Sequence, residues 1–156
     1  MDEKQGLLRH TLATLAYRAA RALDGAPEGF AEFDGVGRRP AAILTHMGDL
    51  FDWALSAAAG QERWHSSKPL TWAEEQARFF AALGALDAYL SSEEPVHAPI
   101  EGLMQGPVAD ALTHVGQLAM MRRLAGSPTR GENFFVAAIE VGQVGAEQPA
   151  AVQPFK

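Results

Sequence analysis

Two histidines and a carboxylate occupy positions from which they could bind a divalent metal. Asp110, His114 and Gln117 are spaced four and three residues apart, so a helix would place them on one face, together with Leu103. In a separate segment, His46 shares a helical face with apolar side chains, and we expect it to be buried. Two neutral imidazoles and one carboxylate would leave a fourth coordination position open. His46, Asp110 and His114 are therefore the predicted metal ligands.

A carboxylate at an inward-facing helix position needs a partner, because an unpaired buried charge is costly. A cation, a hydrogen-bonded histidine or a protonated state would each satisfy Asp110. A histidine that faces a core is also often simply hydrogen-bonded, so a buried polar pair of Asp110 and His114 is the alternative to a metal site. Gln117 has its own alternative, as an amide that bonds a backbone group or a dimer partner.

The remaining histidines and the tryptophans are weaker candidates for the site. His10 falls on the polar side of its predicted helix, and His65 and His97 lie in loop-like sequence. Trp53 and Trp72 are predicted to fill the core, and the alternative is that they wall a pocket. Trp53 and Gln117 are the candidate cofactor-binding residues.

The candidate ligands lie in an all-α domain that we expect to span residues 1–156. Apolar residues recur at three- and four-residue steps in four segments, which predicts four helices. These segments are 4–23, 40–60, 71–90 and a fourth that begins between residues 100 and 107 and ends at residue 124. Thr71 and Glu74 have the spacing of a capping box at the start of the third helix. The tail, from about residue 127 to 156, is expected to cross the bundle in irregular form.

Composition excludes several functional classes. The chain is 47% hydrophobic and 21% charged, as is typical of a globular domain. A formal charge of −6 and the absence of a basic patch argue against nucleic acid as a partner. No apolar run approaches the ~18 residues of a membrane span, and the acidic start of the chain is unlike a secretory signal. The chain has no cysteine, which suits a reducing compartment, and we expect a cytoplasmic protein with no membrane partner.

Together these segments resemble the DinB/YfiT-like family of metal-binding bundles. Its members have up-down-down-up four-helix topology, one metal-ligating histidine in the second helix and an H-x-x-x-H-x-x-Q pattern in the fourth. The corresponding segments here are ILTHMGDLFDWAL, DALTHVGQLAMMRRLAG and, in the tail, GENFFVAAIEVGQVG. The resemblance implies that His46 and His114 are ligands and that Gln117 accompanies them. Asp110 stands where the first histidine of the pattern is expected, which shifts the preference among Zn, Ni, Mn and Fe toward harder metals.

For function, the resemblance implies a metal-dependent transferase or isomerase that uses a low-molecular-weight thiol of the bacillithiol or mycothiol type. A metal-bound water would instead make the protein a hydrolase, and the sequence leaves both nucleophiles open. The alternative is a non-enzymatic dimeric bundle that has a degraded metal site and binds an apolar small molecule. Leu112, Val115 and Ala119 form a second apolar face on the fourth helix, from which we expect a homodimer.

Overall fold

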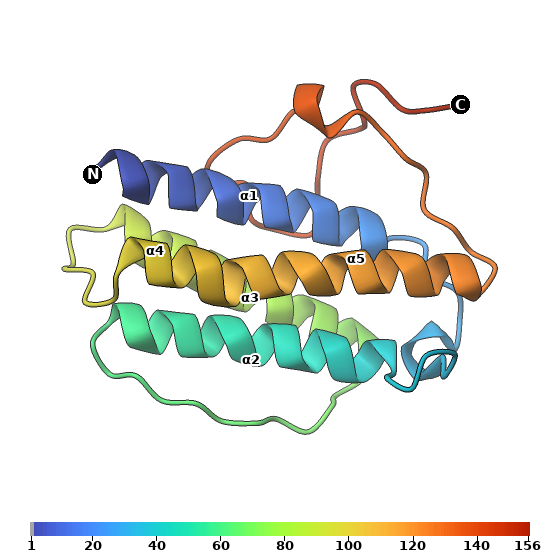
Figure 1. Ribbon diagram of the computed structural model, residues 1–156, viewed down its shortest axis with the longest axis horizontal. Helices are drawn as coiled ribbons and strands as arrows, with labels where there is room; N and C mark the ends of the chain where they lie inside the picture. The colour runs from blue at the N-terminus through green and yellow to red at the C-terminus, as the bar shows by residue number, and fades with distance from the viewer. Residues whose placement is uncertain (1) are drawn as a thin grey trace.

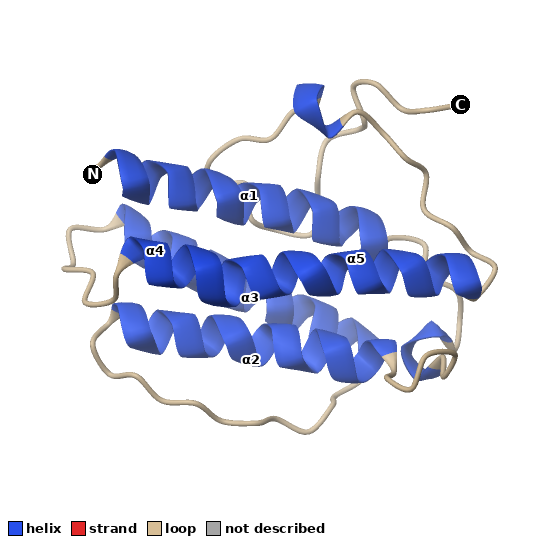
Figure 2. Cartoon of the chain, viewed as in Figure 1, coloured by secondary structure: helices blue, strands red, loops and turns tan. Residues whose placement is uncertain are grey.

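The computed structural model describes residues 2–156 and consists of helices joined by loops (Figure 1, Figure 2). Its elements are α1 (Glu3–Leu23), η1 (Phe30–Glu32), α2 (Pro40–Ala58), α3 (Trp72–Ser91), α4 (Ile100–Leu103), η2 (Met104–Val108), α5 (Ala109–Leu124) and η3 (Phe134–Val136). Within residues 2–156 there is no β-strand, and an isolated bridge joins Glu132 to Pro154. The prediction of an all-helical fold is confirmed.

The long helices pack side by side as a bundle. Both α1 and α2 pack against α3 and α5. Figure 1 shows that α1 and the α4–α5 segment run in one direction, whereas α2 and α3 run in the other. Because α2 and α3 point the same way, residues 59–71 return along the length of the bundle to connect them. Among the helices of residues 2–156, none combines the length and the apolar character that a membrane span requires.

The periodic apolar residues form the core, as the sequence predicts. Leu8, Leu12 and Leu15 of α1 are fully buried, and so is Phe79 of α3. Each such side chain stabilises the fold by roughly 2 kcal/mol when it is removed from water. The start of α3 is set by the predicted capping box at Thr71, whose hydroxyl and backbone both bond to the third residue of the helix.

The fourth helix is continuous from Ile100 to Leu124 but contains a π-helical turn, η2. Pro107 lies inside this turn. Proline has no N–H to donate and its ring crowds the preceding turn, so a wider turn accommodates it better than a regular α-helical one. The extra residue of a π turn rotates the next residues of the helix about its axis. Leu103 is therefore buried while the Asp110 side chain is 44% exposed, and the prediction that both share one inward face is wrong.

Polar contacts hold the tail, residues 127–156, across the bundle. The carboxylate of Glu132 is buried and accepts hydrogen bonds from the Tyr17 hydroxyl at 2.6 Å and from Arg21 Nε at 2.9 Å. Both partners lie on α1, and Figure 1 shows the tail passing over that helix. The tail is largely irregular, as predicted, and the single-turn helix η3 interrupts it.

Arg122 joins the end of α5 to the end of α1 and to the start of the tail. Its guanidinium is buried and donates to the carbonyl oxygens of Ala22, Asp24, Gly25 and Ser127. Burial lowers the pKa of Arg122, because desolvation disfavours the charged form. The side chain thus satisfies carbonyl groups at the ends of α1 and α5 that regular helical bonding leaves unpaired.

Replacing Arg122 with methionine is expected to lower the free energy of unfolding by about 3 kcal/mol, because several buried carbonyl groups lose their donor. Urea unfolding followed by circular dichroism measures the change. The exposed neighbour Arg123, replaced with methionine, serves as the control and is expected to change stability by under about 0.5 kcal/mol. Equal losses in the two variants would contradict the role assigned to Arg122.

Candidate metal centre

The packing of α2 against α5 brings the three predicted ligands together. His46 Nε2 lies 3.2 Å from Asp110 Oδ2, and His114 Nε2 lies 3.2 Å from the same oxygen. The two imidazole rings are nearly perpendicular, with centroids 5.0 Å apart. One ligand atom from each residue can be chosen so that all three lie within 4.8 Å of one another. His46, Asp110 and His114 therefore form one cluster on two facing helices.

The cluster lies at the edge of the bundle and not in its centre. The exposed fraction of the side chain is 8% for His114, 29% for His46 and 44% for Asp110. The prediction that His46 is buried is wrong, because the residue faces the margin between α2 and α5. The argument that Asp110 needs a cation because it is buried fails for the same reason. What distinguishes Asp110 is that two imidazole nitrogens converge on one of its oxygens.

Gln117 determines how the His114 ring presents its nitrogens. Its side-chain Oε1 lies 2.7 Å from His114 Nδ1. An amide oxygen only accepts, so Nδ1 must carry the proton, and in a neutral ring Nε2 then presents a lone pair. That lone pair points at Asp110 Oδ2, which is also an acceptor. A proton or a metal ion between the two atoms would relieve this contact.

The donor set fits a divalent metal ion. In a tetrahedral site with bonds of about 2.0–2.1 Å, neighbouring ligand atoms are roughly 3.3–3.4 Å apart, close to the observed 3.2 Å separations. A ligating histidine usually donates its second N–H to an outer partner, which fixes the ring, and Gln117 has that position beside His114. Since Asp110 is the most exposed of the three, the side of the cluster nearest it is open to solvent.

The aromatic side chain next to the cluster is Trp64, which sequence reasoning missed. Its ring centroid lies 5.9 Å from that of His46, and its indole Nε1 donates to Ser66 Oγ at 3.2 Å. Trp64 belongs to the connection between α2 and α3, whose sequence has no periodicity to indicate which residue turns toward the bundle. The candidate Trp53 instead lies two helical turns beyond His46, packs partly against the core and donates to Glu62 at 3.3 Å.

A second group of potential ligands, Asp49, Asp52 and His65, already contains a cation from the chain itself. The Arg78 guanidinium donates to the carboxylates of both Asp49 and Asp52. His65 Nε2 is 3.8 Å from Asp49, too far for a hydrogen bond. Ser67 donates to Asp49 through both its backbone and its hydroxyl. This group is therefore an ion-pair network, buried at Asp49, that ties the connecting loop to α2 and α3.

The two other histidines lie away from both groups, as their sequence context indicates. His10 is exposed on α1. His97 is in the loop before α4, where its ring packs close to Gly60. Neither belongs to a cluster of potential metal ligands within residues 2–156.

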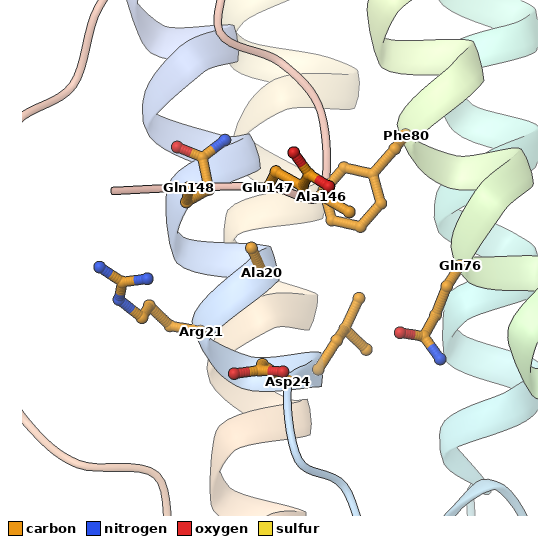
Figure 3. A pocket seen from close by; sticks show the side chains of 9 residues that line it. Ala20, Arg21, Asp24, Gln76, Phe80, Ala146, Glu147 and Gln148 are labelled. Carbon is orange, nitrogen blue, oxygen red and sulfur yellow. The ribbon is translucent and has the colours of Figure 1, made fainter. Parts of the chain in front are cut away.

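Two hollows lie near the ends of the helices. A groove of about 460 Å³ runs between α2 and α5 and is lined in part by Ile43 and by Gln117, the partner of His114. Another hollow of about 350 Å³ lies between α1, α3 and the tail, where Arg21, Phe80 and Gln148 contribute to its walls (Figure 3). None of the three predicted ligands lines either hollow, but the groove reaches the cluster through Gln117, which contacts His114.

The second apolar face predicted on the fourth helix is partly used within the chain. Val115 is buried in the core, and Leu112 and Ala119 pack against it. All three line a hollow that is shared with Arg18 of α1 and Phe134 of the tail. Homodimerisation through this face stays a prediction.

Comparison of the chain with protein-family models, with curated proteins and with solved structures gives no match. The class of protein therefore rests on the fold and the site. They define a helical bundle with a group of His and Asp side chains that could hold a metal ion.

The ion pairs of Asp49 predict how stability depends on pH. Burial acts to raise the pKa of Asp49, but the hydrogen bonds from Ser67 and the Arg78 guanidinium outweigh it, so the pKa lies below the ordinary 3.8. A lowered folded-state pKa stabilises the protein fully above 3.8, and this contribution is lost as pH falls below that value. Urea unfolding of Asp49→Asn between pH 7 and pH 3 should show lower stability at pH 7 and a smaller loss in acid than wild type. Identical acid profiles would rule out this linkage.

Proposed function

We propose that the protein binds one divalent metal ion through His46, Asp110 and His114 and acts as a metal-dependent enzyme of the DinB/YfiT-like type. The convergence of two imidazole Nε2 atoms on one Asp110 oxygen, each at 3.2 Å, carries the proposal. The helix directions in Figure 1 and the positions of the ligands on α2 and α5 support the resemblance to that family.

Each side chain of the cluster has a distinct role in this proposal. His114 is the buried ligand, and Gln117 holds its ring so that Nε2 faces the other two residues. His46 is the second imidazole ligand, and the ring of Trp64 lies beside it. Asp110 supplies the negative charge and lies at the solvent side, where a substrate would approach. A divalent metal held by these residues would lower the pKa of a bound thiol or water and supply a nucleophile at neutral pH.

A thiol is the nucleophile we favour, so the proposed activity is S-transfer by a low-molecular-weight thiol. The chain has no cysteine of its own, so the thiol would come from a cofactor. Hydrolysis by activated water is the second possibility for the same residues. In Co(II)-substituted protein, a sulfur-to-metal charge-transfer band on adding a small thiol such as cysteine would support the transferase. An absorption spectrum of the cobalt site that does not change on adding the thiol would favour the hydrolase.

A non-enzymatic binding protein is the second candidate function, and the groove of about 460 Å³ between α2 and α5 favours it. This volume is within the range of small-molecule sites, roughly 300–1,000 Å³. In that case Asp110 and His114 would form an ion pair without a metal, and stability would not respond to divalent ions.

Metal content is the direct test of the proposed ligands. Protein purified without chelator is expected to contain about one Zn, Ni, Mn or Fe per chain, and His46→Ala and His114→Ala are each expected to lose it. Elemental analysis measures the content, and thermal unfolding with and without chelator measures the linked stability. His10→Ala is the matched control, since His10 is exposed on α1, and it should retain the metal. Wild-type protein that stays metal-free after incubation with each ion would contradict the proposal.

The role of Gln117 has its own test. Replacing Gln117 with leucine removes the acceptor at His114 Nδ1 and leaves the three metal ligands unchanged. We expect the affinity for Zn(II) to fall about 10- to 100-fold. Competition with a chromophoric chelator measures this affinity. Gln117→Glu restores an acceptor and should bind Zn(II) at least as tightly as wild type. If Gln117→Leu binds as tightly as wild type, the contact with His114 does not position the ligand.

A further inference from the structure

We propose that the groove between α2 and α5 binds an amphiphilic anion, a molecule with an apolar body and a carboxylate or similar anionic group. As the substrate site of the metal centre, this inference rests on the proposed function. As a binding site, it stands on the groove alone.

The walls of the groove are apolar and partly exposed. Ile43 and Met121 form its inner surface, and Met120 and Val36 lie at its rim with exposed fractions of 57% and 54%. Large apolar side chains that line a concave surface gain free energy when an apolar ligand removes them from water. Methionine side chains are also flexible and can adapt to ligands of different shape. The walls of the groove therefore favour a ligand with an apolar body.

A single charged side chain, Arg38, lines the groove. Arg38 is exposed in the loop before α2, and no ion pair forms with it within residues 2–156. The adjacent Arg39, in contrast, is paired with Glu32 at 2.8 Å. The whole chain carries a formal charge of −6. The unpaired arginine beside the groove is a local positive charge on this negative chain, and it attracts an anion. The planar guanidinium is suited to carboxylates and related groups.

The groove adjoins the metal cluster through Gln117. This residue lines the groove and contacts His114 Nδ1. Ile43 precedes His46 by one helical turn on α2, and Gly116 and Gln117 follow His114 on α5. A molecule bound in the groove would therefore lie within about one helical turn of the three metal-binding residues. Its anionic group would face Arg38 and its other end would face the cluster.

Isothermal titration with three probes of equal chain length tests the charge preference: octanoate, 1-octanol and octylammonium. Chelator-treated protein is titrated first, because a bound metal would itself attract a carboxylate. We expect octanoate to bind more tightly than 1-octanol and octylammonium to bind most weakly. Arg38→Gln should weaken octanoate about fivefold and leave 1-octanol unchanged. Arg39→Gln is the matched control, with the same change in charge at a paired neighbour, and should leave octanoate binding intact.

Adding a negative charge to the groove gives a second, independent result. Met120→Asp is expected to weaken octanoate and to strengthen octylammonium, whereas Leu7→Asp on the exposed face of α1 should change neither. No octanoate binding by wild type, or equal effects of Arg38→Gln and Arg39→Gln, would overturn the inference. Comparing octanoate binding with the metal content of the same protein separates the two proposals. A chain that binds octanoate but no metal retains the groove and loses the proposed activity, and the reverse result removes the groove alone.

Discussion

The packing of α2 against α5 is the constraint on which the candidate site depends. These helices run in opposite directions, so a position early in α2 lies opposite the middle of the continuous helix from Ile100 to Leu124. His46 is thereby placed across from Asp110 and His114, which a helical spacing of four residues has already set on one side of α5. The core on either side, from α1 and α3, holds the two helices in register. A change that slides α2 along α5 by one turn would displace His46 by about 5 Å relative to Asp110 and His114.

The interface between α2 and α5 has a polar cluster and, beside it, an apolar groove, which suits a site that both binds and converts a substrate. His114 is nearly buried, His46 is half-buried beside Trp64, and Asp110 is open to solvent, so the cluster has an inner and an outer side. The apolar groove begins about one turn away and ends at Arg38. Gln117 belongs to both regions. A substrate could therefore be anchored by its apolar body and its charge while its reacting end lies beside the ligands, which is how binding energy is used for orientation.

Sequence patterns predicted the helices, grouped the ligands and placed His114 inside, but failed on the burial of His46 and Asp110. Periodicity identified the core leucines because a helix repeats every 3.6 residues and buries one face. The same periodicity placed Asp110 on the helical face of Leu103, and the π turn at Pro107 changed that relation. Trp64 escaped notice because its position depends on how a loop without periodicity folds across α2. The ion pairs of Asp49 with Arg78 also join helices that the sequence does not show to be neighbours.

The state of the His114 ring tests the central claim most directly. Nitrogen-15 NMR of protein with labelled histidines reports which imidazole nitrogens carry protons. In the Zn-loaded protein, we expect His114 to keep its proton on Nδ1, beside Gln117, and to present an unprotonated Nε2 to the metal. Adding Zn(II) should shift the Nε2 resonances of His46 and His114 and leave His10 unchanged. If the His114 ring stays protonated at both nitrogens and its resonances do not change on adding Zn(II), the residue forms an ion pair with Asp110. That result would contradict the metal centre.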